Sequence, residues 1–173
     1  MVYEFNKSLK KGKTAELMAE AIFREKGLDY IDVRDDPEYQ SIDVDYVING
    51  KKFEVKKNYH EARLGRPGLF FWAELSVGDN EGFWYRSKAD YFMFFDDDGN
   101  GIVIKNTDAF RNVVTGFIEN GDHGYNGKNR IDTIKDKRYG GYIEARNLRV
   151  YLDDLEAAGI DTIKKITKAT NHM

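Results

Sequence analysis

The Asn49-Gly50 dipeptide is the feature that most constrains how this chain folds. It separates two strand-like runs, residues 42–48 and residues 51–56. Asn-Gly between two such runs is the strongest short-range signal for a β-hairpin, because a type I′ turn needs a positive φ at both central residues. The sequence therefore predicts a hairpin over residues 42–56 with a two-residue loop.

The two-residue loop also predicts which residues face each other across the hairpin. The expected pairs are Ile48 with Lys51, Val47 with Lys52, Tyr46 with Phe53, Asp45 with Glu54, Val44 with Val55 and Asp43 with Lys56. Opposed residues share a face of the sheet, and each strand alternates between faces. One face is therefore expected to carry Asp43, Asp45, Glu54 and Lys56. The three carboxylates repel one another unless cations lie among them, and a divalent metal ion beside the lysine would meet that need.

Length and composition narrow the class of protein. The chain has 173 residues, of which 41% are hydrophobic and 33% charged, and this predicts a soluble folded domain. No apolar run is long enough to span a membrane, and no signal peptide is expected. The absence of cysteine excludes disulfides and cysteine-ligated metal sites and suits a reducing, intracellular compartment. A net charge of −3 gives no overall attraction to nucleic acid, so binding would need local basic clusters.

Hydrophobic periodicity and turn signals predict a mixture of helices and strands. Helices are expected at 12–26 and 107–118, with a polar helical stretch at the C-terminus. Strands are expected at 30–33, 69–77, 83–85, 91–95, 102–105 and 139–150, in addition to the hairpin. At most one helical turn is expected at 87–90, and a glycine-rich surface loop at 119–130.

The order of these elements resembles that of the PD-(D/E)XK nuclease superfamily. A helix with an acidic residue is followed by a hairpin with an aspartate and then by residues 54–56, a Glu-X-Lys element. Residues 11–16 are similar to the first helix of that family, and residues 69–74 with 88–91 are similar to small phage-type members. The resemblance covers residues from about 10 to 105. It implies a restriction-endonuclease-like fold, an αβββαβ core with a mixed central sheet flanked by helices.

The same resemblance implies how the chain is divided. We expect a single nuclease domain over residues 1–173, with a core at about 10–118 and a C-terminal elaboration at about 119–170. An intracellular, phage-encoded protein is what the similarity to phage-type members implies.

The resemblance assigns a role to each residue of the expected site. Asp43, Glu54 and the main-chain carbonyl of Val55 would bind Mg²⁺ or Mn²⁺, and Lys56 would orient or help to deprotonate the attacking water. Glu16 would be the added acidic residue of the first helix. The chemistry agrees, because Mg²⁺ prefers oxygen ligands and keeps several waters, so that one or two carboxylates and a substrate phosphate are enough. A bound metal polarises the phosphate and lowers the pKa of its water.

Two choices within this set stay open on the sequence. Asp43 lies eleven residues before Glu54, and Asp45 lies nine residues before it. The usual spacing in the family favours Asp43, whereas the strict hairpin register favours Asp45, and a β-bulge would reconcile the two. On the first helix Glu16 is preferred to Glu20, because Glu16 is expected beside the apolar stripe and Glu20 further toward solvent.

Basic and aromatic side chains are candidates for contacts with the substrate. Lys57, Arg63 and Arg66 could line a channel for the phosphate backbone, although such residues are more often simply solvated. Trp72 and Trp84 could stack on bases, but core packing is the default expectation. The charged face of the hairpin also has an alternative interpretation, as an exposed surface with solvated salt bridges.

These observations lead to the hypothesis of a metal-dependent nuclease that hydrolyses DNA, with an endonuclease favoured. The residues do not separate DNA from RNA as the substrate, nor endonuclease from exonuclease. A homodimer is considered because a duplex has two strands to cut. The alternative is a catalytically inactive nuclease-fold protein that binds DNA or a protein partner.

Overall fold

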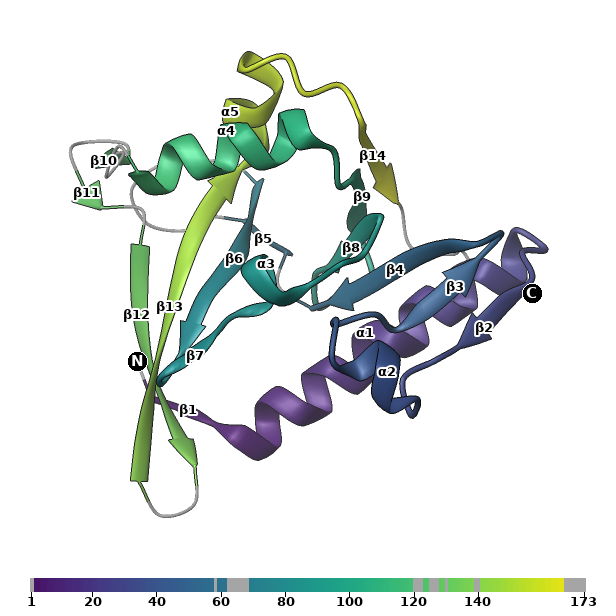
Figure 1. Ribbon diagram of the computed structural model, residues 1–173, viewed down its shortest axis with the longest axis horizontal. Helices are drawn as coiled ribbons and strands as arrows, with labels where there is room; N and C mark the ends of the chain where they lie inside the picture. The colour runs from purple at the N-terminus through teal and green to yellow at the C-terminus, as the bar shows by residue number, and fades with distance from the viewer. Residues whose placement is uncertain are drawn as a thin grey trace. The chain divides into compact units, whose positions relative to one another are not determined.

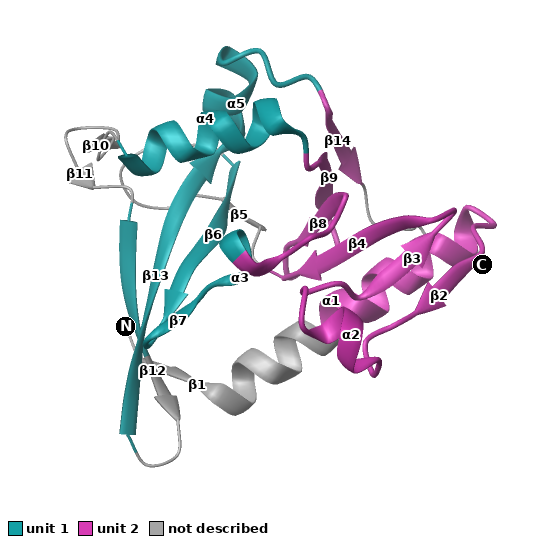
Figure 2. Ribbon diagram, in the orientation of Figure 1, with its two compact units in different colours: residues 1–8, 60–85, 107–161 teal, residues 9–59, 86–106, 162–173 magenta. Residues whose placement is uncertain are grey.

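The chain forms two compact units, each assembled from segments that lie apart in the sequence (Figure 1, Figure 2). The computed structural model describes residues 2–57, 59–61, 69–119, 123–124, 128–129, 131–138 and 141–166, and the side chains of 14–57, 69–119, 131–135 and 141–166. Unit 1 comprises residues 1–8, 60–85 and 107–161, and unit 2 comprises residues 9–59, 86–106 and 162–173. The expectation of a single domain over residues 1–173 stays a prediction.

A six-stranded mixed sheet forms the centre of unit 2. Its strands, in sheet order, are β14 (Ile163–Ile166), β9 (Gly101–Lys105), β8 (Tyr91–Phe95), β4 (Lys51–Lys56), β3 (Tyr46–Ile48) and β2 (Tyr30–Asp32). All neighbouring strands are antiparallel except β4 and β8, which run parallel. The prediction of a mixed α/β protein with a mixed central sheet flanked by helices is confirmed.

Helix α1 (Phe5–Glu25) covers one face of this sheet (Figure 1). The buried residues of this layer are Ala15, Ala19, Ile22 and Phe23 of the helix and Tyr46, Ile48, Val55, Met93 and Phe95 of the sheet. The helix ends as predicted at Gly27, which has a φ of 65°, and the N–H of Leu28 closes the last turn on the carbonyl of Phe23 at 2.8 Å. It begins earlier than the predicted residue 12, at Phe5.

The Asn49-Gly50 hairpin is confirmed, with the predicted register at its closed end. Asn49 and Gly50 have φ values of 51° and 75°, as a type I′ turn requires. The paired residues of β3 and β4 are Tyr46 with Phe53, Val47 with Lys52 and Ile48 with Lys51.

The prediction that the first strand starts at residue 42 is wrong. Pro37–Gln40 form a short helix, α2, because the side chain of Asp36 accepts a hydrogen bond from the N–H of Glu38 at 2.9 Å. The chain leaves α2 through a turn, in which the N–H of Asp43 bonds to the carbonyl of Gln40 at 3.2 Å. Strand β3 therefore begins only at Tyr46.

A second sheet forms the centre of unit 1. Its strands, in order, are β1 (Val2–Glu4), β12 (Ile131–Arg138), β13 (Gly141–Tyr151), β6 (Leu69–Val77) and β5 (Tyr59–Glu61), and β7 (Asn80–Glu81) also pairs with β6. Helix α4 (Asp108–Glu119) packs Phe110 against this sheet, with ring centroids 6.4 Å from Phe71. Thr107 caps α4 as predicted, since its hydroxyl accepts from the N–H of Phe110 at 3.1 Å.

Several predictions outside the hairpin are wrong in unit 1 and near the C-terminus. Residues 83–85 are not extended but belong to helix α3 (Phe83–Arg86), which buries both Phe83 and Trp84. Residues 87–90 contain no helical turn, which agrees with the prediction of one turn at most. Up to residue 166, where the described part of the chain ends, the C-terminal helical stretch is limited to α5 (Leu152–Ala157), which strand β14 follows.

The segment expected to be a surface loop lies largely outside the described residues. Two short strands, β10 (His123–Gly124) and β11 (Lys128–Asn129), pair within it. Among the described residues, no helix is both long and apolar enough to cross a membrane.

Candidate active site

Glu54 and Lys56 form the centre of the candidate site on strand β4. They are separated by one residue and so point to the same face of the sheet, opposite to Val55, which packs against α1. The Nζ of Lys56 lies 2.6 Å from the Oε1 of Glu54. The Glu54 side chain is only 2% exposed, whereas that of Lys56 is 34% exposed. The pair therefore joins a buried carboxylate to an ammonium group at the edge of solvent.

The surroundings of this pair on the sheet are apolar. In the parallel ladder between β4 and β8, Glu54 lies beside Phe92 and Lys56 beside Phe94, and both rings are fully buried. An ionised carboxylate in such surroundings loses its hydration and needs a cation or hydrogen-bond donors in return.

Asp45 reaches the same strand through an irregularity in the hairpin. Its backbone N–H bonds to the carbonyl of Phe53 at 2.8 Å, although Phe53 is already the partner of Tyr46. Two residues of one strand thus lie opposite one residue of the other, which is the arrangement of a β-bulge. The Oδ2 of Asp45 accepts a hydrogen bond from the N–H of Val55 at 2.8 Å, so a side-chain carboxylate supplies an acceptor just beyond the last residue pair of the ladder.

Asp43 makes a different set of contacts. It has a left-handed backbone with a φ of 47°, and its carboxylate is held by Arg86 in two hydrogen bonds of 2.7 Å and 3.0 Å. Its carbonyl accepts from the hydroxyl of Ser87 at 3.0 Å. Of the two aspartates left open by the sequence, Asp45 is therefore the one attached to Val55. The geometry favours Asp45 over Asp43, and metal binding by either stays a prediction.

Burial and charge shift the pKa values of the site in opposite directions. Burial raises the pKa of Glu54 well above its ordinary value, Lys56 opposes this rise, and Asp45 adds to it. Burial likewise raises the pKa of Asp45, against the opposing effects of Lys56, of the N–H of Val55 and of a hydrogen bond with Glu54 that needs a proton on one of the two carboxyl groups. Burial lowers the pKa of Lys56, but the neighbouring carboxylates outweigh it and leave the pKa above its ordinary value. Lys56 is therefore protonated and only partly balances its acidic neighbours.

One oxygen of Glu54 has no hydrogen bond. Its Oε2 is buried and has no hydrogen-bond partner in the part of the chain that the structure describes. Asp45 cannot donate to it while both groups are ionised, because an ionised carboxylate is only an acceptor. A buried acceptor without a donor is costly, and a cation that prefers oxygen ligands would remove that cost.

The oxygen ligands available here suit a metal ion that keeps several waters, such as Mg²⁺. They are too few for a metal that is coordinated by protein side chains alone. Within residues 14–57, 69–119, 131–135 and 141–166, no group of three or more His, Cys, Asp or Glu side chains already surrounds a position for a metal. Asp45, Glu54 and the carbonyl of Val55 offer two carboxylates and one main-chain oxygen. Mg²⁺ commonly keeps several waters and takes one or two protein carboxylates, so this set is sufficient.

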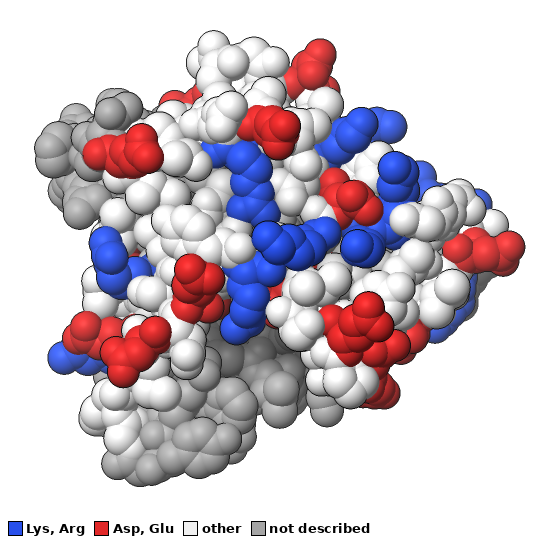
Figure 3. Space-filling model, viewed as in Figure 1, with Lys and Arg blue, Asp and Glu red and all other residues white. Residues whose placement is uncertain are grey.

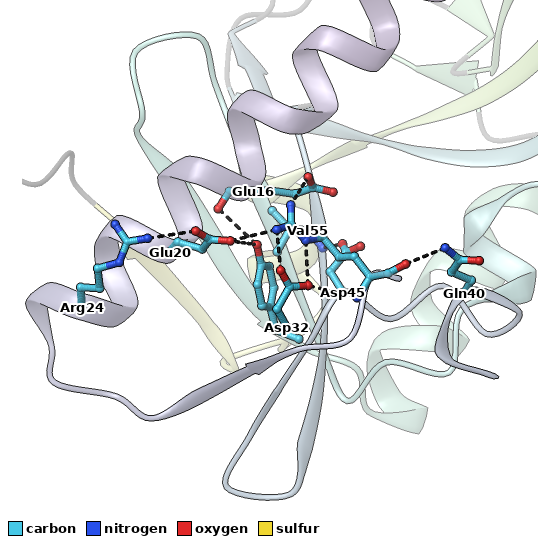
Figure 4. A network of polar contacts seen from close by, with 9 residues as sticks. Glu16, Glu20, Arg24, Asp32, Gln40, Asp45 and Val55 are labelled. Atoms are coloured by element: carbon cyan, nitrogen blue, oxygen red, sulfur yellow. Dashed lines mark hydrogen bonds and ion pairs between the residues drawn. The ribbon is translucent and has the colours of Figure 1, made fainter. Parts of the chain in front are cut away.

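Glu16 and Glu20 lie on α1 in a network of charged groups (Figure 4). Arg34 donates to the Oε2 of Glu16 at 2.5 Å and to the Oε1 of Glu20 at 3.1 Å. The hydroxyl of Tyr46 also donates to Glu20, at 2.8 Å. The expectation that Glu20 points further toward solvent is wrong: its side chain is 12% exposed and that of Glu16 is 20% exposed. The hydrogen bonds from Arg34 and Tyr46 hold the Glu20 side chain close to the sheet.

Glu16 is nevertheless the helix residue that the charges of the site affect. Burial raises the pKa of Glu16, Arg34 lowers it, and the charges of Asp45 and Lys56 act on it in opposite directions. The preference for Glu16 as the acidic residue of the first helix is therefore consistent with its electrostatic surroundings, and its catalytic role stays a prediction.

Of the three basic residues predicted to contact the substrate, the structure describes the side chain of Lys57. The Nζ of Lys57 is paired with the Oδ1 of Asp97 at 2.8 Å, and the Lys57 side chain is 13% exposed. Arg63 and Arg66 lie outside the described residues. On the face shown in Figure 3, acidic and basic side chains are interspersed, as expected for a chain with 27 Lys and Arg and 30 Asp and Glu.

The two tryptophans pack within unit 1. Trp84 is 1% exposed, and the guanidinium of Arg111 lies 4.2 Å from the centre of its ring, which confirms core packing. The indole N–H of Trp72 donates to the Oδ2 of Asp132 at 3.1 Å.

Three polar residues of the site region were not found by sequence reasoning. They are Arg34, Tyr46 and Arg86. Tyr46 had a usable signal, because the hairpin register places it on the same face as the apolar residues that meet α1. Arg34 and Arg86 had none, since each contacts residues far from it in the sequence.

No family model matches this chain, and neither a curated protein nor a solved structure shows a significant match to it.

Proposed function

We propose that this chain is a metal-dependent nuclease that hydrolyses phosphodiester bonds in DNA, with a restriction-endonuclease-like site. Asp45, Glu54 and the carbonyl of Val55 are the proposed metal ligands, and Lys56, as an ammonium group, is the proposed water-orienting and charge-stabilising group. Asp43 remains the second candidate for the aspartate. Glu16 is the proposed additional acidic residue.

The observation that carries the proposal is the buried Oε2 of Glu54, which has no hydrogen-bond partner in the described chain. It belongs to a carboxylate that is 2% exposed and lies near a second carboxylate, Asp45, with one lysine to balance them. An ordinary surface salt bridge would leave both oxygens in contact with water. In a metal-binding site, the bound cation would contact this oxygen and take the place of a hydrogen-bond donor.

The topology of unit 2 supports the same proposal. The strand with Glu54 and Lys56 forms a hairpin with the preceding strand and then pairs in parallel with β8, while α1 covers one face. The helix, the hairpin and the strand with Glu54 and Lys56 follow one another in the order on which the resemblance rests. The resemblance to the PD-(D/E)XK nucleases therefore rests on the residues and on this topology together.

The residues offer a route for hydrolysis. When bound, Mg²⁺ or Mn²⁺ polarises the scissile phosphate and lowers the pKa of coordinated water. Lys56, which is 34% exposed, can reach a water or a phosphate oxygen at the edge of solvent. One proton of the water leaves to the solvent, the oxygen of the water forms a bond to phosphorus, the bond from phosphorus to the leaving oxygen breaks, and the leaving oxygen takes up a proton from the solvent. The ammonium of Lys56 stabilises the negative charge that grows on the phosphoryl oxygens.

A cleavage assay tests the proposal. Supercoiled plasmid, linear duplex and single-stranded DNA are incubated with Mg²⁺, Mn²⁺ or EDTA, beside the Lys56→Ala and Glu54→Gln variants. Metal-dependent cleavage that both substitutions abolish supports the nuclease. Lys51→Ala is the matched control, because Lys51 is an exposed lysine of the same strand at its distal end. A nicked product indicates single-strand cuts, and a linear product indicates that both strands were cut, by two chains together or in two separate events.

The alternative is an inactive nuclease-fold protein that binds DNA or a protein partner. The ion pair between Lys56 and Glu54 is the observation that favours it, because that pair already balances one oxygen of Glu54. Folded protein that binds duplex DNA in filter assays but cleaves none of the substrates would support this alternative.

A further inference from the structure

Arg34 connects three carboxylates of unit 2 through one guanidinium group. Figure 4 shows where these carboxylates, of Glu16, Glu20 and Asp32, lie. Its Nη1 lies 2.5 Å from Glu16, and its Nη2 lies 3.1 Å from Glu20. Its Nε and Nη2 also form a bidentate pair with Asp32, at 2.9 Å and 2.6 Å. A planar fork with five donors can make all these bonds at once, which the single ammonium of a lysine cannot do in the same geometry.

Arg34 is itself held firmly in place. Asp32 fixes the guanidinium and also accepts from the backbone N–H of Arg34 at 3.1 Å. The side chain of Gln40 donates to the carbonyl of Arg34 at 2.7 Å. The guanidinium carbon lies 5.4 Å from the centre of the Tyr46 ring, within the range of a cation–π contact. The position of Arg34 therefore does not depend on Glu16 alone, because Asp32 of β2, Gln40 of α2 and Tyr46 of β3 also hold it.

Glu16 depends on Arg34 for its own position. Within the described residues, Arg34 is the cation that contacts the Glu16 carboxylate, at 2.5 Å. The negative charge of Asp45 acts against an ionised Glu16, so a carboxylate there without Arg34 would favour another rotamer or a proton. Glu20 has two other partners, Tyr46 and Arg24, and does not depend on Arg34 in the same way.

We propose that Arg34 is a positioning residue of the nuclease site: it holds the carboxylate of Glu16 toward Asp45. This inference rests on the proposed nuclease function and deepens it, because it names the group through which the helix contributes to the site. Arg34 acts through Glu16 and not by contact with the substrate. A residue of this kind typically changes activity by about 10- to 100-fold when it is removed.

The test is a double-mutant cycle on the cleavage rate. Arg34→Met, Glu16→Gln and the double variant are compared with the unchanged chain, each with Mn²⁺ and plasmid DNA. We expect Arg34→Met to lower kcat by about 10- to 100-fold with little change in KM. We also expect the double variant to cleave no more slowly than Glu16→Gln alone, because a residue that acts through Glu16 has no effect once Glu16 is absent.

Four further variants separate positioning from a general effect on folding. Arg34→Lys keeps the charge and should recover part of the lost rate. Arg24→Met removes an exposed arginine that contacts Glu20 but not Glu16, and it should cleave at the unchanged rate. A cycle of Arg34→Met with Glu20→Gln should be additive. Urea unfolding measures the free energy of unfolding of each variant. A double-mutant cycle on these free energies gives the interaction between Arg34 and Glu16 without an activity measurement.

The outcomes distinguish the two proposals. If the unchanged chain cleaves DNA but Arg34→Met cleaves equally well, or if its effect adds to that of Glu16→Gln, the positioning role is overturned and the nuclease stands. If the unchanged chain neither cleaves DNA nor is stabilised by Mn²⁺, the proposed function fails, and the positioning role fails with it. If Arg34→Met does not fold, Arg34→Lys with Glu16→Gln and their double variant form the deciding cycle.

Discussion

The carboxylate of Asp45 accepts a hydrogen bond from the backbone N–H of Val55 at 2.8 Å, although the two residues are ten positions apart in the sequence. The contact attaches Asp45 to the strand that carries Glu54 and Lys56. This relationship separates Asp45 from Asp43, whose carboxylate is held by Arg86.

Asp45→Asn is expected to lower the cleavage rate by about 100-fold. The asparagine keeps an oxygen that can accept from the N–H of Val55, so the local fold is retained while the negative charge is lost. Asp43→Asn should have a much smaller effect, because Asp43 is engaged by Arg86. Initial rates on supercoiled plasmid check both variants. The reverse order of effects would identify Asp43 as the aspartate of the site.

Mn²⁺ should stabilise the folded chain, because the unfolded chain lacks the arrangement of Asp45, Glu54 and Val55. At a concentration about 100 times the Kd, the stabilisation is about 2.7 kcal/mol. Thermal unfolding with increasing Mn²⁺ measures it as a rise in Tm. Glu54→Gln should remove most of the rise, and an equal rise in this variant would place the metal elsewhere.

The metal-free chain should be more stable in mild acid than at neutral pH. Burial raises the pKa values of Glu54, Asp45 and Glu16, so the folded chain holds more protons than the unfolded chain between their ordinary and their raised values. Stability therefore falls as the pH rises through that window. Lys56, whose pKa is also raised, is protonated in both states there and adds no slope.

Urea unfolding with EDTA at about pH 5 and about pH 7 checks this expectation. Glu54→Gln should flatten the dependence, because the amide does not titrate. If the chain became less stable on going from neutral to mildly acidic pH, the pKa values of these carboxyl groups would not be raised in the folded chain.

Gly50→Ala should destabilise the fold by about 1 kcal/mol without a direct effect on the site. Gly50 has a φ of 75°, and a Cβ at this position would meet no atom within 4 Å, so backbone strain is the only cost. Gly116→Ala is the matched control. Gly116 lies in α4 with equally open space, and alanine there should stabilise the helix by about 0.5–1 kcal/mol. Equal effects of both substitutions on urea unfolding would contradict the turn assignment.

The closed end of the hairpin could be predicted because its information is local. The Asn-Gly turn determines the pairing of Tyr46 with Phe53, and this in turn places Glu54 and Lys56 on one face. The bulge at Asp45 was not predictable as a definite structure, because two sequence arguments pointed to different aspartates. The contact of Asp45 with Val55 is what distinguishes them.

The contacts that surround the site depend on residues far away in the chain. Arg34 contacts Glu16, which is 18 positions away in the sequence, and Arg86 contacts Asp43, which is 43 positions away. No local sequence pattern predicts either contact. The extended interpretation of residues 83–85 failed for a related reason. Consecutive apolar residues can be buried in a strand or in a helical turn, and only the neighbours in space decide between the two.

The position of strand β14 in the sequence determines when the sheet of unit 2 can be completed during synthesis. The sheet that carries Glu54 and Lys56 is completed at β9 by residues 163–166, more than a hundred positions later in the chain. While the chain is being synthesised, the ribosome therefore releases the site residues long before their sheet can close, and until then β9 offers an open edge to other chains. A nascent chain that stalls before β14 contains every proposed catalytic group and an unfinished scaffold.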